Sequence, residues 1–419
     1  MRVVVYPHDL GLGGSQLNAV ELAGAVRDLG HDVVVYGRPG ALVGRVEQLG
    51  LEFVPSPPPG RRPSARVVTD LRRLVRRRGV DVVHGYEWPP ILEARMAALG
   101  ADVAAVGTVM SMAVAPFIPR RVPLVVGTAQ IGAAERQRGR AHVTVIEPPI
   151  DLQDNRIDAP ELADDVPAFA RRYGVDTRRP VVVVVTRLAR ELKLEGLLTA
   201  VRTVPDLHGA PTLVVVGDGP ERQAVAAAAD DANRAAGREA VVLTGPLDDP
   251  RPAYAVADVV LGMGGSVLRA MAFGKPVVVQ GEGGFWSRLT PDTLHRFRWE
   301  GWYGVGPDPD LGSDALRAQL QPLLRDEQAR VAAGEYAREV VQAHGLVAAA
   351  ERQAQEYERA VTARAGRRLD LVGDTTGAAR LVTHVAGRHV QRLRGRASTD
   401  DFNARPVAAE PRTPQGAAR

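Results

Sequence analysis

Arg187 and Lys193 are two basic residues that could bind the phosphates of a ligand. Arg187 closely follows a run of five valines, 181–185, and Lys193 lies six residues later, where we expect a helix to begin. Because such a run is typical of a buried strand, both cations would lie at the carboxyl end of that strand, where they could share the charge of a departing diphosphate. The alternative is an exposed loop arginine and a helix-surface lysine. The position of both residues just after the carboxyl end of a buried strand favours phosphate binding.

A second candidate anion site is the turn formed by Gly264, Gly265 and Ser266. It follows a strand expected at 258–263 and opens a helix that carries Arg269. Free N–H groups at a helix start attract an anion, and we expect Ser266 to cap this helix. The turn could instead be an ordinary strand-to-helix connection, but three small residues in a row favour the close approach of a ligand.

Two further glycine turns also follow expected strands. Gly13 and Gly14 follow the first strand and open a helix, so they could contact a diphosphate or an acceptor. The alternative is a tight turn with Ser15 as the helix cap. The run is not the dinucleotide-binding motif GxGxxG, because residue 16 is not a glycine. Gly217 and Asp218 form the other turn, at the end of the strand expected at 212–218.

Short valine-rich runs alternate with helical patterns in both halves of the chain, which is typical of parallel sheets covered by helices. Strands are expected at 2–7, 32–37, 52–56, 80–86, 103–109, 124–128 and 142–148 in the first half, and at 181–186, 212–218, 240–245, 258–263 and 277–281 in the second. The prolines of 147–151 mark the crossover between the halves. The pattern predicts an α/β protein of two Rossmann-like doubly wound domains that face each other across a cleft, with ligands beyond the carboxyl ends of the strands.

The predicted organisation has four parts. Residues 1–150 form the first domain, and 151–345 form the second. A helix at 346–363 is expected to return toward the first domain, and 364–419 is a basic, partly disordered tail.

The motifs together resemble those of the GT-B-fold retaining glycosyltransferases of family four, also called group 1. The segment 258–278 is close to the donor-site signature of that family, and Arg187 and Lys193 match its arginine–lysine pair. Gly13-Gly14 matches its N-terminal glycine pair, and 217–220 matches its nucleotide-side loop. The resemblance covers about residues 1–360. It implies that 1–150 is the acceptor-side domain, that 151–345 is the domain that binds the nucleotide-sugar, and that Gly217 and Asp218 lie on the donor side of the site.

This resemblance implies transfer of a hexosyl group from a nucleoside-diphosphate sugar to a hydroxyl acceptor, with retention of the anomeric configuration. Arg187 and Lys193 would hold the diphosphate, with support from the amides of Gly264, Gly265 and Ser266. It implies no metal, because the cations and a helix dipole replace one, and no cofactor besides the sugar-nucleotide substrate.

The chain departs from the family pattern at two carboxylates. The family commonly has two glutamates eight residues apart, at the positions of Leu261 and Arg269 here. The second usually binds ribose hydroxyls, so Arg269 is expected to contact a phosphate or an acidic acceptor instead. Glu282, in the turn after the next strand, could replace a lost carboxylate as a catalytic group. Its alternative is an ordinary exposed turn residue.

A further departure is Met110, which stands about where family members often have a histidine near the transferred sugar. His84 and Glu87 share one strand-end loop and are alternative polar groups facing the cleft. We expect His84 to be catalytic, and Glu87 and Met110 to lie on the acceptor side. The alternative for His84 is a structural histidine.

These departures keep two other functions open. One is a degenerate homologue that binds a nucleotide-sugar or a partner without transfer. The other is a nucleotide-sugar epimerase on the same fold, which would release the nucleotide and change the sugar without an acceptor.

Composition narrows the class of protein. The 419 residues include no cysteine, which excludes disulfides and cysteine metal sites and fits a reducing compartment. With no signal peptide recognised and no apolar run of the ~20 residues that span a bilayer, we expect a cytoplasmic protein, at most peripheral to a membrane. Basic residues cluster at 61–78 and from 364 onward. Up to residue 400, neither cluster contains an aromatic residue that could stack on a base, so we expect no nucleic-acid partner.

Two stretches allow several interpretations. The amphipathic stretch 377–395 could lie on a membrane, pack on the body of the protein or join a partner subunit. The aromatic residues of 281–303 could stack on a sugar or pack a loop over the core, and packing is the favoured interpretation.

Overall fold

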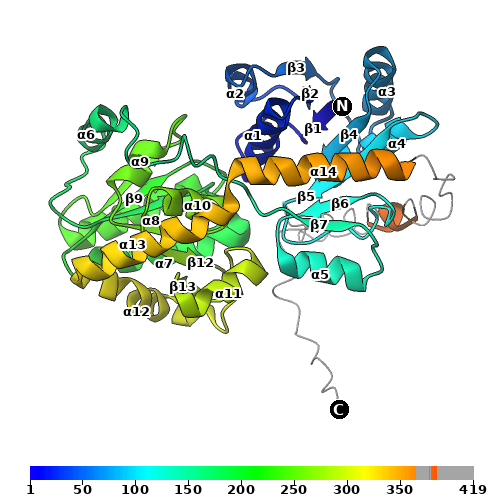
Figure 1. The fold of residues 1–419 in the computed structure, drawn as a ribbon. Coiled ribbons are helices and arrows are strands. Elements are labelled where there is room, and N and C mark those ends of the chain that lie inside the picture. Colours follow the sequence, from blue (N-terminus) through cyan, green and yellow to red (C-terminus); the bar gives the residue numbers. More distant parts are fainter. Residues whose placement is uncertain (365–376, 378, 385–419) are drawn as a thin grey trace.

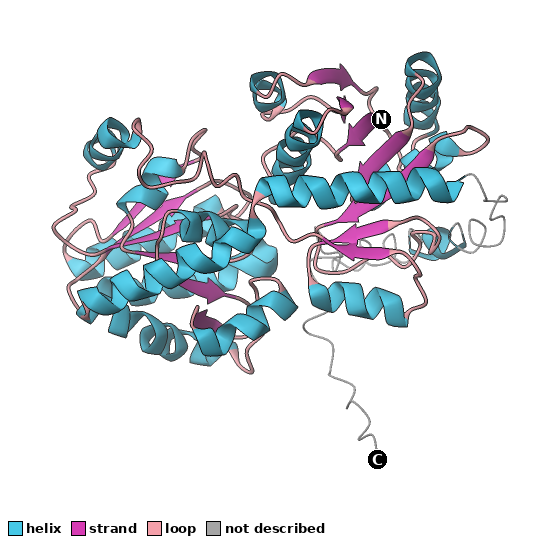
Figure 2. Cartoon of the chain, in the orientation of Figure 1, coloured by secondary structure: helices cyan, strands magenta, loops and turns pink. Residues whose placement is uncertain are grey.

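The computed structural model describes residues 1–364, 377 and 379–384 (Figure 1). The chain forms two β-sheets, each with helices packed around it (Figure 2). The predicted fold class, two Rossmann-like domains, is confirmed. The strands are rich in valine, and most of their residues are buried, as a parallel sheet between two helical layers requires.

The first sheet has the strand order β3-β2-β1-β4-β5-β6-β7 and is parallel throughout. Its strands are β1 (Arg2–Tyr6), β2 (Asp32–Gly37), β3 (Glu52–Pro55), β4 (Val82–Tyr86), β5 (Ala104–Val109), β6 (Leu124–Val126) and β7 (Val143–Val145). Its helices are α1 (Gly14–Asp28), α2 (Val43–Gln48), α3 (Ala65–Arg78), α4 (Trp88–Ala98) and α5 (Ala129–Gln137). The order reverses between β1 and β4, so the loops that follow these two strands open the crevice where ligands bind in such sheets.

The second sheet has the order β10-β9-β8-β11-β12-β13. Its strands are β8 (Val181–Val185), β9 (Thr212–Val216), β10 (Val241–Gly245), β11 (Val259–Gly262), β12 (Val277–Gln280) and β13 (Trp286–Arg288). Its helices are α6 (Leu162–Arg172), α7 (Glu195–Thr203), α8 (Arg222–Ala236), α9 (Arg251–Val256), α10 (Gly265–Ala272), α11 (Pro291–Glu300), α12 (Gly312–Arg325) and α13 (Glu327–Val341). Here the order reverses between β8 and β11. This reversal places the residues after β8, among them Arg187, beside the glycine turn after β11.

The chain passes between the domains twice, at residues 147–151 and 342–346. The two passes are hydrogen-bonded to each other: the amide of Ile150 donates to the carbonyl of His344 at 2.8 Å, and the amide of Leu346 donates to the carbonyl of Ile150 at 2.9 Å. After the second pass, α14 (Leu346–Arg364) lies across the first domain and packs against α1 and β5 (Figure 1). Ala349, Ala350, Tyr357 and Ala360 of α14 belong to the core of the first domain.

All twelve predicted strands are present, and each end lies within three residues of the expected one. The strand β13 was not expected. It is only three residues long and pairs with β12 in the antiparallel direction, and neither its length nor its Trp-Ser-Arg sequence is distinctive. The predicted helix cap at Ser266 is wrong, because Gly264 is the residue that precedes α10. Ser15, the alternative cap of the first helix, does not precede α1 either, because Gly13 holds that position.

The stretch 377–395 is described only at 377 and 379–384, and this part packs on the first domain. Arg380 Nη1 donates to the carbonyl of Pro116 at 3.2 Å, and the rings of His384 and Phe117 lie 5.1 Å apart. Residues 365–376, 378 and 385–419, which hold the rest of the predicted tail, lie outside the described residues. None of the helices in the described part of the chain combines the length and apolar composition needed to cross a bilayer.

Candidate functional site

Arg187 and Lys193 both lie beyond the carboxyl end of β8. Arg187 is exposed and Lys193 is half-buried. Burial, and secondarily the positive charge of Arg187, lowers the pKa of Lys193. No hydrogen bond or ion pair joins either side chain to another residue in the described part of the chain. Two neighbouring cations without a counter-ion form a site that an anion would stabilise.

The loop after β9 fixes the backbone that carries Arg187. A Cβ atom at Gly217 would lie 1.9 Å from the carbonyl oxygen of Thr186, and one at Gly219 would lie 2.3 Å from that of Leu188. Glycine therefore allows the two loops to touch along their backbones, and the amide of Leu188 donates to the carbonyl of Asp218 at 3.0 Å. The Asp218 carboxylate accepts the amide of Gly219 at 2.8 Å, which stabilises its own turn.

The glycine turn after β11 lies on the other side of the β8/β11 crevice. Gly264 precedes α10 with φ +55°, a conformation that favours glycine. The amides of Gly265 and Ser266 lie in the first helical turn, where the helix itself offers no acceptor. The Ser266 hydroxyl donates to the carbonyl of Met263 at 3.1 Å and does not cap the helix. The amide of Gly264 donates to the carbonyl of Trp302 at 2.9 Å, so the prediction that it supports an anion is wrong. The amides of Gly265 and Ser266 remain available to an anion.

Glu282 lies in the turn after β12, facing the segment that carries Lys193. Its carboxylate accepts the amide of Leu192 at 3.2 Å and the hydroxyl of Tyr303 at 2.7 Å. It is therefore half-buried and hydrogen-bonded on both oxygens rather than an ordinary exposed turn residue. Nothing in the residue pattern identified Tyr303 as its partner.

Arg269 does not face the phosphate site freely, because its guanidinium pairs with a carboxylate of the first domain. Arg269 Nη2 lies 3.0 and 3.2 Å from the two carboxylate oxygens of Glu21, which is on α1. The exposed fractions of the two side chains are only 16% and 8%. Burial raises the pKa of Glu21, and the charge of Arg269 opposes that shift. Glu21 was not predicted from the sequence, since nothing in the pattern of α1 distinguishes it from a surface glutamate.

On the first domain, Glu87 joins three loops. It accepts the Ser15 hydroxyl at 3.1 Å, the amides of Met110 and Ser111 at 2.9 and 3.2 Å, and the Ser111 hydroxyl at 2.8 Å. Its φ of +64° is rare for a residue other than glycine. Met110 is half-buried, and at Gly14 the position of a Cβ atom would be open space. Gly13 and Gly14 thus begin α1 next to a loop cluster that Glu87 holds together.

The prediction that His84 faces the cleft is wrong. Its side chain is fully buried, and its two ring nitrogens lie 2.7 Å from the hydroxyl of Tyr357 on α14 and 2.6 Å from that of Thr108. Burial lowers the pKa of His84 to about 3, so the ring stays neutral. His84 is a structural residue that connects β4 to α14.

The two domains meet close to Lys193. Met112, from the loop that follows β5, packs with Leu192 and Tyr303 of the second domain in a small apolar cluster. The Lys193 segment therefore lies within side-chain reach of the loop that carries Met110. The predicted aromatic stretch contributes packing, since Phe285, Trp286, Trp302 and Tyr303 are buried and only Trp299 is substantially exposed.

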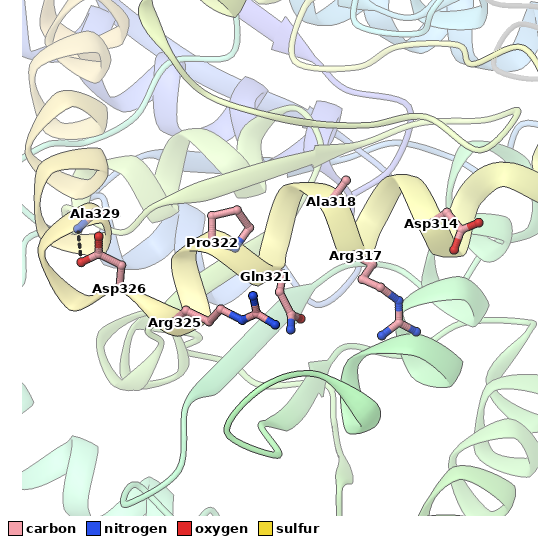
Figure 3. A pocket seen from close by; sticks show the side chains of 8 residues that line it. All are labelled: Asp314, Arg317, Ala318, Gln321, Pro322, Arg325, Asp326 and Ala329. Atoms are coloured by element: carbon pink, nitrogen blue, oxygen red, sulfur yellow. Dashed lines mark hydrogen bonds between the residues drawn. The ribbon is translucent and has the colours of Figure 1, made fainter.

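Other parts of the molecule offer less. A groove of about 660 Å³ runs along α12 to the start of α13, and none of the predicted site residues lines it (Figure 3). Among residues 1–364, 377 and 379–384, no group of three or more metal-ligating side chains is close enough to hold a metal ion.

Comparisons with known proteins agree with the fold. A family model described as "Glycosyl transferase 4-like domain" matches residues 13–138, and one described as "Glycosyl transferases group 1" matches residues 179–293. The 2-deoxystreptamine glucosyltransferase of Streptomyces kanamyceticus is 32% identical over 182 residues. That match covers 40% of this chain and 43% of the relative, so it spans less than half of either protein.

Solved structures share the architecture at low identity. HepE of Anabaena in complex with UDP superposes with a TM-score of 0.65 at 17% identity, covering 86% of this chain and 100% of that one. Sucrose-phosphate synthase of Thermosynechococcus elongatus gives 0.64 at 17% identity, covering 87% and 100%. The catalytic domain of starch synthase IV of Arabidopsis thaliana, bound to ADP and acarbose, gives 0.65 at 14% identity, covering 86% and 99%.

The paired Rossmann-like domains therefore define a GT-B fold. The two family models match more than half of the chain between them, one in each domain. The chain belongs to the group 1 glycosyltransferases.

Proposed function

We propose that this protein transfers a hexosyl group from a nucleoside-diphosphate sugar to a hydroxyl acceptor. The observation that carries the proposal is the pair Arg187 and Lys193, two cations without an anionic partner among the described residues, beside the open first turn of α10. Family membership supports it, as do the complexes of HepE with UDP and with UDP-glucose.

The reaction would break the bond between the anomeric carbon and the diphosphate. Arg187, Lys193 and the amides of Gly265 and Ser266 would stabilise the charge that develops on the leaving oxygen. The acceptor oxygen would attack on the same face of the sugar, and its proton would pass to the leaving phosphate. That geometry retains the anomeric configuration and needs no covalent nucleophile. The cations and the helix start would do the work of a metal, so we expect activity to survive a chelator.

Lys193→Ala tests the diphosphate site. Removing the cation should lower donor turnover by about 10²- to 10³-fold, as for loss of one group that stabilises transition-state charge. Calorimetric titration with UDP- and GDP-sugars, followed by an assay of nucleotide release, would measure binding and turnover.

Arg178→Ala is the matched control for Lys193→Ala. Arg178 is an exposed cation that pairs with Asp176 before the amino end of β8, whereas the site lies beyond the carboxyl end of that strand. Its removal should leave turnover unchanged. Near wild-type turnover in Lys193→Ala would contradict the proposed site.

A binding protein without transfer is the second candidate. The two positions where the family commonly has glutamates hold Leu261, which is fully buried in the sheet, and Arg269, which pairs with Glu21. Neither position therefore offers a carboxylate to the donor. Binding of nucleotide-sugars without turnover, across a panel of hydroxyl acceptors, would favour this function. Release of free nucleotide with a changed sugar and no acceptor would instead indicate an epimerase.

We further propose a cytoplasmic location with peripheral membrane contact. The membrane contact is supported by α3, whose exposed face carries several arginines, among them Arg66, Arg76 and Arg77. Such a face favours anionic headgroups. Sedimentation with anionic and with neutral vesicles tests the contact, and equal binding to both would contradict it.

A further inference from the structure

The backbone beside Lys193 is held in an unfavourable conformation. The segment Arg190–Leu194 is a short helical turn interrupted by Glu191 and Leu192, and Leu192 has φ +66° and ψ −16°. A bulky side chain rarely adopts a positive φ, because its Cβ then lies too close to the backbone. Leu192 keeps this conformation while its side chain is buried against Met112 and Tyr303. Another part of the fold must stabilise the segment.

Glu282 supplies that stabilisation. One of its carboxylate oxygens accepts the amide of Leu192 at 3.2 Å, and the other accepts the hydroxyl of Tyr303 at 2.7 Å. Tyr303 is fully buried, so the carboxylate is held by a rigid partner. A hydrogen bond from an amide to a carboxylate is roughly twice as strong as one between neutral groups.

The same two segments are also joined in the opposite direction. Glu195, the first residue of α7, accepts the amide of Gly284 at 2.7 Å and that of Gly283 at 3.2 Å. Glu282 of the turn after β12 thus accepts an amide of the Lys193 segment, and Glu195, which follows that segment, accepts two amides of the turn. This reciprocal pairing fixes both ends of the backbone from Leu192 to Glu195, with Lys193 between them.

We infer that Glu282 is a positioning residue, which holds Leu192 in its left-handed conformation and thereby directs Lys193 toward the donor diphosphate. Both carboxylate oxygens have protein partners, so Glu282 need not touch the substrate to have this effect. The inference rests on the proposed function, since it assigns Glu282 a role in the same donor site.

A double-mutant cycle with Leu192→Gly tests the inference. Glycine adopts a positive φ without strain, so the amide hydrogen bond matters less in that background. Glu282→Ala alone should raise the dissociation constant for UDP by about tenfold, on the order of one hydrogen bond to a charged group. In the Leu192→Gly background, Glu282→Ala should raise the dissociation constant for UDP by a clearly smaller factor. The packing lost with the leucine side chain is common to both Leu192→Gly proteins and cancels in the cycle.

Conservative and control variants separate positioning from general stability. Glu282→Gln keeps an oxygen for the Leu192 amide and should restore most of the affinity for UDP. Asp326→Ala removes a carboxylate that caps α13 by accepting the amide of Ala329 at 3.1 Å, and should lower the melting temperature without changing UDP affinity. If Glu282→Ala does not fold, Glu282→Asp replaces it, because the shorter side chain withdraws the carboxylate from the Leu192 amide.

The outcomes distinguish the inference from the proposed function. Wild-type protein that binds neither UDP nor inorganic pyrophosphate would contradict both. Wild-type binding with unchanged affinity in Glu282→Ala, or in Glu282→Asp where it replaces the alanine variant, would overturn the inference alone. An equal loss in the wild-type and Leu192→Gly backgrounds would also overturn it, because the loss would then be unrelated to the backbone conformation at that position.

Discussion

At the scale of single residues, the donor site depends on charges that the protein leaves unbalanced. Arg187 and Lys193 repel each other, and this repulsion adds to burial in lowering the pKa of Lys193. A bound diphosphate would relieve the repulsion, so the energy of ligand binding includes removal of an unfavourable interaction within the free protein.

This arrangement predicts a pH dependence of donor binding. An anionic ligand prefers protonated Lys193, so UDP affinity should be constant at low pH and fall as the pH rises through the lowered pKa of the lysine. The fall should begin below the range of an ordinary lysine, whose pKa is about 10.4. Titration of UDP binding from about pH 7 to about pH 10 would measure it.

Lys193→Arg is the matched variant for this pH prediction. An arginine stays protonated throughout that range, so the fall that belongs to Lys193 should disappear. A fall of the same size in both proteins would assign the titration to another group.

Some of these residues could be predicted from their types and others could not. Arg187 and the glycines of the turns were recognisable because strands end just before them. His84 was misplaced because a histidine at the end of a strand looks the same in the sequence whether it faces a ligand or a helix. Its actual partner, Tyr357, lies 273 residues further along the chain.

At the scale of elements, close contact between loops determines where the site residues lie. The β8 and β9 loops touch backbone to backbone at Gly217, which has φ +137°. The valine strands and their order follow from residue patterns, but helix starts are less predictable. Ser15 and Ser266 have the right type for caps, yet each hydroxyl has another partner, Glu87 in one case and the carbonyl of Met263 in the other.

Gly217→Ala should therefore damage both stability and the site. The added Cβ would collide with the carbonyl of Thr186, and we expect a loss of about 1–3 kcal/mol in the free energy of unfolding with weaker UDP binding, because Arg187 is displaced. Urea denaturation and calorimetry measure the two effects.

Gly44→Ala provides the control for this substitution. Gly44 lies within α2, and apart from its chain neighbours and the nearby backbone of that helix no atom of the described residues comes within 4 Å of the added Cβ. Alanine there should leave UDP binding unchanged and stabilise the fold by about 0.5–1 kcal/mol. Full UDP affinity in Gly217→Ala would show that the β9 loop does not position Arg187.

At the scale of the whole molecule, a largely buried ion pair joins the two domains. Glu21 on α1 and Arg269 on α10 come from helices that both begin at glycine turns of the candidate site. The pair therefore couples the relative position of the domains to the elements that line the site.

Arg269→Glu should weaken this contact strongly. Two carboxylates would then face each other in a mostly buried place, and breaking such a pair typically costs about 3–5 kcal/mol. We expect a larger radius of gyration in small-angle X-ray scattering and faster hydrogen exchange in α1 and α10. The double variant Glu21→Arg with Arg269→Glu should recover much of the wild-type behaviour. No recovery would indicate that Arg269 has a separate role, such as contact with the ligand.

The return of α14 to the first domain has a consequence for how the protein is made. Residues 1–150 complete their core with Ala349, Tyr357 and Ala360, and His84 finds its partner only on that helix. During synthesis the apolar core of the first domain therefore stays incomplete until the whole second domain has left the ribosome. The second domain is the unit that can finish folding first, although it is translated later. A chain that stops before residue 346 would leave a strip of the first domain's apolar core open to chaperones and proteases.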